Sequence, residues 1–308
     1  MTCPPRILVL PPRLTASARA LRATALRRGL RIVEATASAV PEGLGSPGWA
    51  RWAEEAGWLE EAGLTAGTGR TGSTEDTGST MSTGSTEGTR GTEGEGEGEG
   101  HAVHLHAGPS FADVVAPALG IALLEAPADW LARLPRALTR REIRAMPIGE
   151  AYRLRRPAFV KSPNDKSIPA LVYADGSRLP GPDAVDPATP VLVSDVMTFA
   201  VEYRLHLLDG AVHTAGQYAE AGRLRLGPPD GGALAFGRDV LAAAAETLPS
   251  AIVVDVGRDD EGRWAVIEAN AAWASGCYSA DPGRALDTVL RAAGPATDLS
   301  SHDRGFVR

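Results

Sequence analysis

Residues 251–270, AIVVDVGRDDEGRWAVIEAN, contain the pattern that decides the fold of this chain. Two largely apolar runs, 251–257 and 263–270, flank the short segment 259–262, which consists of Asp, Asp, Glu and Gly. Apolar runs joined by such a turn-forming segment are typical of a β-hairpin. The sequence therefore predicts two antiparallel strands in this part of the chain.

The predicted hairpin has polar side chains on one face only. If the loop sets the register, Asp255 lies opposite Val266, and alternation places Asp255, Glu268 and Asn270 on one face. The other face is apolar and consists of Val254, Val256, Ala265, Ile267 and Ala269. Acids on a surface hairpin would give the same pattern. An unpaired Glu268 in an otherwise apolar strand would be costly, however, and such oxygen ligands suit Mg²⁺.

The chain also resembles a known family, through this hairpin and segments that precede it. The spacing of Asp255, Glu268 and Asn270 resembles the metal-binding hairpin of the ATP-grasp superfamily. The other segments are 129–135 (DWLARLP), 159–166 (FVKSPNDK), 191–197 (VLVSDVM) and 201–204 (VEYR). Together they are similar to the ATP-grasp group named for one arginine and two lysines, and the resemblance covers residues 120–295.

The resemblance implies a nucleotide site built from three of these segments. Lys161 would contact the ATP phosphates, and Lys166 would be the second lysine and cover the triphosphate. Glu202 would accept hydrogen bonds from the ribose hydroxyls. The adenine pocket would be lined by Asp195, Val196 and Met197. The loop at 162–167 departs from the family pattern, because it reads SPNDKS where that loop is often rich in glycine.

The resemblance also implies the catalytic and metal-binding residues. Arg204 would lie over the transferred phosphate and act together with Lys161. Mg²⁺ would be held by Asp255, Glu268 and Asn270. Phosphoryl transfer depends mainly on positioning and on neutralisation of negative charge, which two lysines, an arginine and Mg²⁺ would supply.

These residues indicate an ADP-forming carboxylate–amine ligase that uses ATP and Mg²⁺. A carboxylate would attack the γ-phosphate to form an acyl phosphate, and an amine would then displace the phosphate. The expected partners are a small-molecule or peptide carboxylate and an amine acceptor, neither of which the sequence identifies. An ATP-dependent kinase on the same scaffold and a non-catalytic nucleotide-binding module remain alternatives.

The N-terminal residues predict a separate α/β domain. Apolar runs at 7–10 and 30–33 flank an Ala-, Leu- and Arg-rich segment, 17–28, and strand, helix, strand is typical of a βαβ unit with a parallel sheet. We assign residues 1–135 to this pre-ATP-grasp-like domain. The predicted ATP-grasp domain, an α+β fold with antiparallel sheets, then spans 136–300 as two subdomains, 136–190 and 191–300, and 301–308 form a tail.

A low-complexity insertion interrupts the N-terminal domain at residues 65–100. Gly, Ser, Thr and Glu dominate it, and we expect it to be disordered because it has almost no apolar surface to bury. Its segment 67–72, GTGRTG, matches a dinucleotide fingerprint only formally, since no strand precedes it and no helix follows it. The next residues include His101, His104 and His106, which fit a strand with polar residues on one face better than a metal site.

Composition excludes several other classes. The net charge is −7, which argues against a nucleic-acid-binding protein. No apolar run approaches the ~20 residues of a membrane span, and two cysteines without ligand spacing favour a cytoplasmic protein. Residues after the hairpin, Trp273 to Tyr278, could shape a second-substrate pocket or serve only packing. The oligomeric state is not readable from the sequence.

Overall fold

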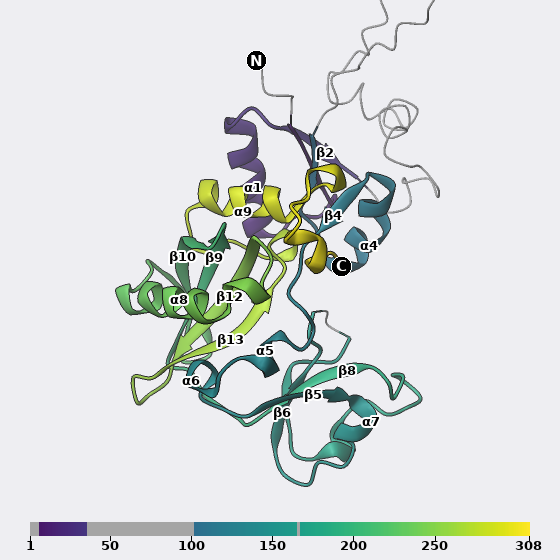
Figure 1. Cartoon of the computed structure of the whole chain (residues 1–308), viewed down its shortest axis with the longest axis vertical. Helices are drawn as coiled ribbons and strands as arrows, with labels where there is room; N and C mark the ends of the chain where they lie inside the picture. Colours follow the sequence, from purple (N-terminus) through teal and green to yellow (C-terminus); the bar gives the residue numbers. More distant parts are fainter. Residues whose placement is uncertain (1–5, 36–101, 165–166) are drawn as a thin grey trace, which may run out of the picture.

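The computed structural model describes residues 6–35, 102–164 and 167–308. The predicted insertion at 65–100, His101 and Lys166 lie outside the described residues. Within them the chain forms a small parallel sheet and two larger antiparallel sheets, arranged along the long axis of the molecule (Figure 1).

The N-terminal sheet is parallel, as the sequence predicts. Its strands are β1 (Arg6–Leu10), β2 (Arg31–Glu34) and β3 (Ala102–Leu105), in the order β2-β1-β3. The connecting helix α1 (Ala16–Arg27) begins where the Thr15 hydroxyl accepts a hydrogen bond from the Ala18 amide at 3.1 Å. The chain continues through α4 (Pro109–Ala118) and β4 (Ile121–Leu123), and β4 pairs with the late strand β14 (Ala293–Pro295).

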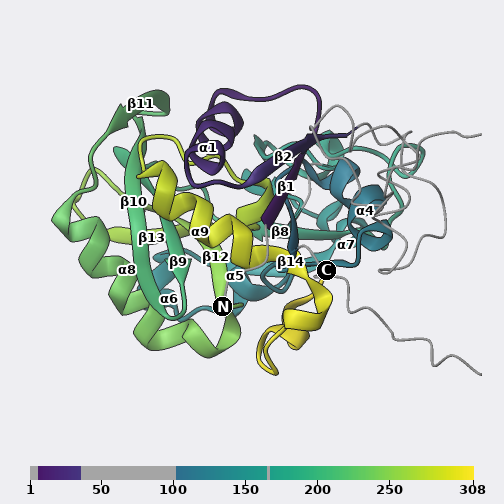
Figure 2. The ribbon, with the colours of Figure 1, turned by 90° about the horizontal axis from the view of Figure 1, so that it is seen from above.

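The central sheet has five antiparallel strands and contains the predicted hairpin. Its order is β11 (Arg223–Gly227), β10 (Ala211–Glu220), β9 (Val201–Leu208), β12 (Ala251–Arg258) and β13 (Trp264–Asn270). Two helices, α8 (Gly231–Ala244) and α9 (Pro282–Ala292), lie on opposite faces of this sheet (Figure 2). The α8 face is apolar and includes Phe236 and Val240 packed with Leu205 and Val254. Burial of this face stabilises the hairpin by removing apolar surface from water.

The second antiparallel sheet has four strands and its own core. Its order is β5 (Ile143–Pro147), β8 (Pro190–Ser194), β6 (Ala158–Lys161) and β7 (Leu171–Tyr173), with α7 (Ile148–Ala151) against it. The short helices α5 (Trp130–Arg133) and α6 (Arg136–Thr139) connect it to the central sheet (Figure 1). The antiparallel sheets predicted for residues 136–300 are therefore confirmed.

The register predicted for the hairpin is wrong by one position near its centre. Asp255 pairs with Glu268 and not with Val266, which pairs with Val256, because β13 contains an extra residue at this point. Such a β-bulge changes the side-chain alternation. Val266 is consequently buried in the apolar core, whereas Ile267 lies beside Gly257, on the face of Asp255.

Residues 301–308, which we set apart as a tail, are folded against the body of the protein. They contain the 3-10 turn η7 (Asp303–Phe306), and Phe306 packs against the N-terminal core. Arg308 forms ion pairs with Asp113 at 2.7 Å and with Glu125 at 2.8 Å.

Candidate functional site

Three adjacent strands bring the predicted polar residues together. Residue Asp255 on β12 pairs with Arg204 on β9 and with Glu268 on β13, so the three side chains form a row across the sheet. All three lie on the face opposite to α8, because residues at i and i+2 of a strand share a face and their neighbours point into the core. The sheet thus places cationic and anionic side chains in direct contact.

Arg204 and Asp255 form the most buried ion pair of this row. The guanidinium donates from Nε to Oδ1 at 2.8 Å and from Nη2 to Oδ2 at 2.7 Å, and from Nη1 to the Gly276 carbonyl at 3.2 Å. Burial alone would lower the pKa of Arg204, but the Asp255 carboxylate raises it above its ordinary value. Arg204 is therefore a permanent positive charge at this position.

A second ion pair connects the two antiparallel sheets. Lys161, the last residue of β6 in the four-stranded sheet, donates to Oε2 of Glu268 on β13. The Asn270 amide donates to Oε1 of Glu268 at 2.9 Å and to Oδ2 of Asp255 at 3.2 Å. Burial alone would raise the pKa of Glu268, but Lys161 and Asn270 lower it below its ordinary value, so this carboxyl is ionised.

The residues predicted to bind magnesium fit a hard cation as a partial set of ligands. Within residues 6–35, 102–164 and 167–308, no group of three or more His, Cys, Asp and Glu side chains is arranged as a metal site. Asp255, Glu268 and Asn270 supply only two carboxylates and one amide oxygen. Mg²⁺ usually takes one or two carboxylates and completes its shell with phosphate oxygens and water, so this set matches Mg²⁺ held together with a nucleotide.

The residues predicted to line the adenine pocket follow β8. The Asp195 carboxylate accepts a hydrogen bond from the Glu142 amide at 3.2 Å, which fixes the chain after the strand. Val196 is exposed, and Sδ of Met197 lies 4.0 Å from Nη1 of Arg141. The structure thus places this segment beside β13, where Arg141 is bound.

Arg141 is a residue of this region that no sequence pattern singles out. Its Nη1 donates to the Val266 carbonyl at 2.9 Å and its Nη2 to the Ile267 carbonyl at 3.2 Å, at the bulge of β13. Its guanidinium also lies 5.8 Å from the centre of the Phe199 ring. Burial lowers the pKa of Arg141 to about 10, and the Glu268 carboxylate opposes this shift. Five arginines between 133 and 144 look alike in the sequence, and only packing distinguishes Arg141.

Glu202, the predicted ribose ligand, lies two residues before Arg204 on the same strand face. One of its carboxylate oxygens accepts a hydrogen bond from the Tyr218 hydroxyl at 2.6 Å. Burial raises the pKa of Glu202, while this hydrogen bond opposes the rise. Tyr218 itself was not predicted, and it comes from β10, which is joined to β9 by a short turn.

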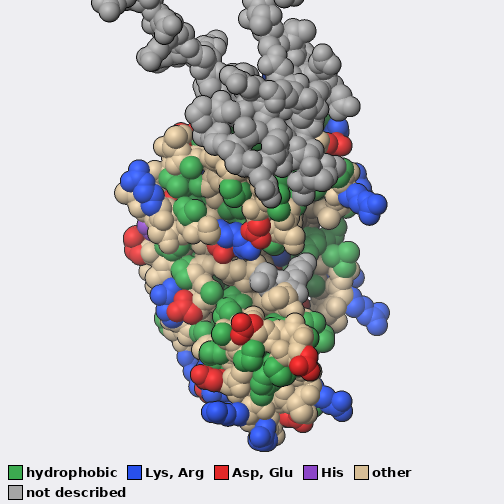
Figure 3. Space-filling model, turned by 90° about the vertical axis from the view of Figure 1, so that its right-hand side faces the viewer, with side chains coloured by type: hydrophobic (Ala, Val, Ile, Leu, Met, Phe, Trp, Pro, Cys, Tyr) green, Lys and Arg blue, Asp and Glu red, His purple; other side chains and the backbone are tan. Residues whose placement is uncertain are grey.

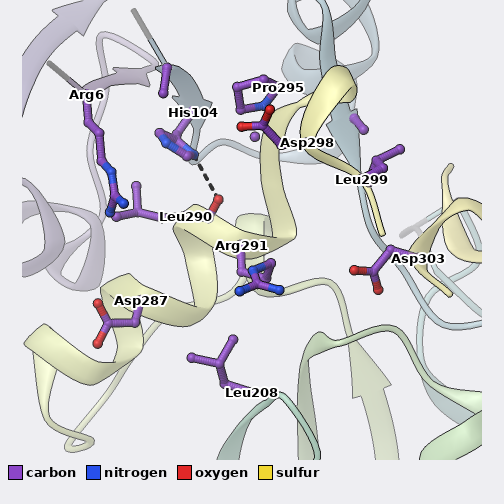
Figure 4. A pocket seen from close by; sticks show the side chains of 13 residues that line it. Arg6, His104, Leu208, Asp287, Leu290, Arg291, Pro295, Asp298, Leu299 and Asp303 are labelled. Carbon is purple, nitrogen blue, oxygen red and sulfur yellow. Dashed lines mark hydrogen bonds between the residues drawn. The ribbon is translucent and has the colours of Figure 1, made fainter. Parts of the chain in front are cut away.

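The two histidines of this N-terminal segment that the structure describes serve to join parts of the chain. Nδ1 of His104 lies 2.8 Å from the Leu290 carbonyl (Figure 4), and Nδ1 of His106 lies 2.7 Å from the Trp273 carbonyl. Because carbonyl oxygens only accept hydrogen bonds, each Nδ1 carries the proton and donates. Burial lowers the pKa of both imidazoles.

A cavity of about 590 Å³ lies elsewhere, between β3, α9, β14 and the C-terminal residues (Figure 4). Several of its charged side chains are already paired: Asp287 binds Arg28 at 2.7 Å, and Arg291 binds Asp209 at 3.2 Å. None of its lining residues belongs to the predicted nucleotide site. A smaller pocket does, since Lys161, Asn164 and Glu268 line it.

The surface gives no support for nucleic-acid binding. On the face shown in Figure 3, positive and negative side chains of the described residues are interspersed and form no continuous basic stripe. Among the described helices, none has the length and hydropathy required to cross a membrane.

Comparison with known proteins agrees with the geometry of this site. Residues 138–288 match a protein-family model for ATP-grasp domains, so this part of the chain is an ATP-grasp domain and the chain is an ATP-grasp superfamily protein. The matching family is the second ATP-grasp domain family of the clade named for one arginine and two lysines. No curated protein sequence matches the chain.

Solved structures of similar fold share little sequence with this chain. The D-cycloserine synthetase DcsG is 13% identical, with 92% of this chain and 98% of that chain covered and a TM-score of 0.47. An L-amino acid ligase from Bacillus licheniformis is 13% identical, with 88% and 68% covered and a TM-score of 0.45. A RimK domain ATP-grasp protein from Sphaerobacter thermophilus is 14% identical, with 92% and 99% covered and a TM-score of 0.43.

Proposed function

We propose that this protein is an ADP-forming carboxylate–amine ligase that uses Mg-ATP and passes through an acyl phosphate. The observation that carries the proposal is the contact between the two antiparallel sheets at Lys161 and Glu268, next to the pair Arg204–Asp255. Two cations and two carboxylates meet there, beside a segment that can receive a purine. ATP and Mg²⁺ are the expected ligands of an ATP-grasp domain of this clade.

The use of lysine supports this assignment. The sequence has 31 Lys and Arg residues, and Lys161 and Lys166 are its only lysines. A chain that uses arginine almost everywhere else has lysine at both positions predicted to contact the triphosphate. A compact ammonium on a flexible stem suits a phosphate contact that must form and break, whereas the planar guanidinium favours fixed two-bond pairs. Arg204, bound through two atoms to Asp255, is such a fixed pair.

The ion pairs also suggest how the site changes when nucleotide binds. In the described structure Lys161 neutralises Glu268, and Arg204 neutralises Asp255. Mg²⁺, when bound, would be held by Asp255, Glu268 and Asn270 and would neutralise charge on the phosphates. Glu268 would then exchange the ammonium for the metal ion, and Lys161 would become free to contact a phosphate oxygen.

The reaction that fits this arrangement has two steps. A substrate carboxylate oxygen forms a bond to the γ-phosphorus, and the bond from that phosphorus to ADP breaks. An amine nitrogen then attacks the acyl carbon, phosphate leaves, and the nitrogen loses a proton. Arg204 and Lys161 would stabilise the negative charge that develops on the transferred phosphoryl group. A small-molecule or peptide carboxylate and an amine are the proposed partners.

Calorimetric titration of Mg-ATP tests the nucleotide site. We expect binding to the wild-type protein that requires Mg²⁺, and a loss of at least about tenfold in Glu268→Gln, because one carboxylate is removed from the metal ligands. Glu246→Gln is the matched control, since Glu246 is exposed and remote from the site. A folded wild-type protein that binds no Mg-ATP would refute the proposal.

Product analysis then tests the reaction. A ligase releases ADP and phosphate only when both an acid and an amine are supplied, so pairs of acids and amines are screened by ADP release. A kinase would instead give ADP and a stable phosphorylated product with one co-substrate.

A further inference from the structure

The loop at residues 275–280, which follows β13, is held between two other parts of the chain. At one end, the Ser279 hydroxyl lies 2.7 Å from the carbonyl oxygens of Gln217 and Gly227. A Cβ atom at Gly216 on β10 would overlap Ser279 and lie 2.6 Å from the Ala280 nitrogen. This end of the loop can therefore approach β10 only because residue 216 is glycine.

The other end of the loop contacts the N-terminal domain. A Cβ atom at Gly276 would lie 2.8 Å from the hydroxyl oxygen of Ser17, in the first turn of α1. The Tyr278 amide also faces this hydroxyl, at 3.4 Å. The loop is thus fixed from both sides, by the central sheet and by α1.

Between these two contacts, Tyr278 lies against Arg204, the arginine proposed above to act on the phosphoryl group. Its ring centre is 4.8 Å from Cζ of Arg204, and it stacks on the Tyr218 ring with the centres 5.2 Å apart and the planes at 19°. Tyr278 has a φ of 46°, in the left-handed region that is unfavourable for a non-glycine residue. Such a conformation persists only where the surroundings enforce it, and it clusters at functional sites.

The two tyrosines leave part of the guanidinium free to bind an anion. Arginine has five N–H donors, and three of those of Arg204 are engaged, two by Asp255 and one by Gly276. The remaining two, one on each terminal nitrogen, have no partner among the described residues. The rings pack beside the guanidinium and restrict its rotation, and both contacts are of the cation–π type.

We propose that Tyr278 is a positioning residue, which holds the Arg204 guanidinium in the orientation that presents its two free N–H donors to the transferred phosphoryl group. The proposal deepens the function proposed above and rests on it. Tyr278 touches no reacting atom in this scheme; it acts through Arg204. What matters is the aromatic ring and its placement by the 275–280 loop, and the hydroxyl group of Tyr278 is not required.

Two substitutions at this position separate the ring from the hydroxyl. Tyr278→Phe keeps the ring, so we expect kcat for ADP release and KM for ATP within about twofold of wild type. Tyr278→Leu removes the ring, so we expect kcat to fall by about tenfold while KM for ATP changes little. Equal losses in both variants, or no loss in the leucine variant, would overturn the proposal.

A spectroscopic measurement tests the geometry without any substrate. The Nε–H group of Arg204 is fixed by Asp255 and lies near the Tyr278 ring, so its ¹H–¹⁵N NMR signal should be shifted by the ring. The signal is assigned by its absence in Arg204→Lys. We expect it unchanged in Tyr278→Phe and displaced in Tyr278→Leu, and an undisplaced signal in the leucine variant would contradict the proposal.

A third variant addresses the placement of the loop. Gly216→Ala should displace residues 279–280 and so reproduce the kinetic and NMR effects of Tyr278→Leu, whereas Gly181→Ala, where a Cβ meets nothing within 4 Å, should have no effect. If the wild-type protein fails to bind Mg-ATP, the proposed function is wrong. The NMR comparison would then still show whether Tyr278 orients Arg204.

Discussion

Arg204 and Asp255 are directly paired on neighbouring strands and are joined by two hydrogen bonds of 2.8 and 2.7 Å. The carboxylate is 1% exposed and the arginine 8%, so both charges are removed from water. Removing charges from water is expensive, and the attraction between them offsets that cost only while both are present. The pair is therefore a source of instability whenever one partner is lost.

We expect Arg204→Met to lower the free energy of unfolding by about 3–5 kcal/mol, because it leaves the Asp255 carboxylate buried and unpaired. Arg204→Met combined with Asp255→Leu should recover a large part of this loss, since no buried charge remains. Urea denaturation of the two variants and the wild-type protein measures the difference. A double variant that is less stable than the single one would show that the pair is not the origin of the effect.

His206 makes stability depend on pH. Its ring is fully buried, and neither ring nitrogen has a hydrogen-bond partner among the described residues. Burial lowers the pKa of His206 from 6.5 to about 3, and the charge of Arg204 contributes to this shift. Between these two pH values the unfolded chain binds a proton here and the native protein does not, so falling pH favours unfolding. This loss begins below about pH 6.5 and amounts to about 1.4 kcal/mol per pH unit.

His206→Leu should remove this pH dependence without breaking a hydrogen bond. Between pH 7 and pH 5 the wild-type protein is expected to lose about 2 kcal/mol more of its unfolding free energy than the variant. Denaturation curves at both pH values provide the comparison. Parallel losses in the two proteins would mean that His206 is protonated in the native state.

The C-terminal residues should contribute to stability. Asp303 is 1% exposed and accepts hydrogen bonds from the Ser250 amide at 2.8 Å and the Ser250 hydroxyl at 2.7 Å. Asp303→Ala leaves these donors unsatisfied, and a loss of about 1–3 kcal/mol in thermal or chemical denaturation is expected. Asp298→Ala, at an exposed position, is the control. Equal stability of both variants would return residues 301–308 to the status of a tail.

Deletion of residues 65–100 should leave Mg-ATP binding nearly unchanged. The composition of this segment indicates a disordered insertion, and the nucleotide site is built from residues after 138. Calorimetry on the deletion variant measures the affinity. A loss comparable to that of Glu268→Gln would mean that the insertion takes part in binding.

Much of the architecture could be predicted from short-range patterns. Alternation along 251–270 predicted a hairpin with polar residues on one face, and strand, helix, strand at 7–33 predicted the parallel sheet. Both predictions depend only on residues close together in the chain, where side-chain period and turn chemistry are decisive. The bulge at Ile267 was missed, because an extra residue in one strand leaves no mark in the alternation of apolar residues.

Local sequence was enough to specify the two antiparallel strands at 251–270, the acids and amide they carry, and the restriction of lysine to positions 161 and 166. The partners of these side chains emerged only from the folded chain: Lys161 with Glu268, 107 positions apart, and Tyr278 with Arg204. Local periodicity specifies which face of a strand is apolar. The contact between two charged or aromatic side chains depends instead on how distant segments pack, and that follows from burial of the whole core.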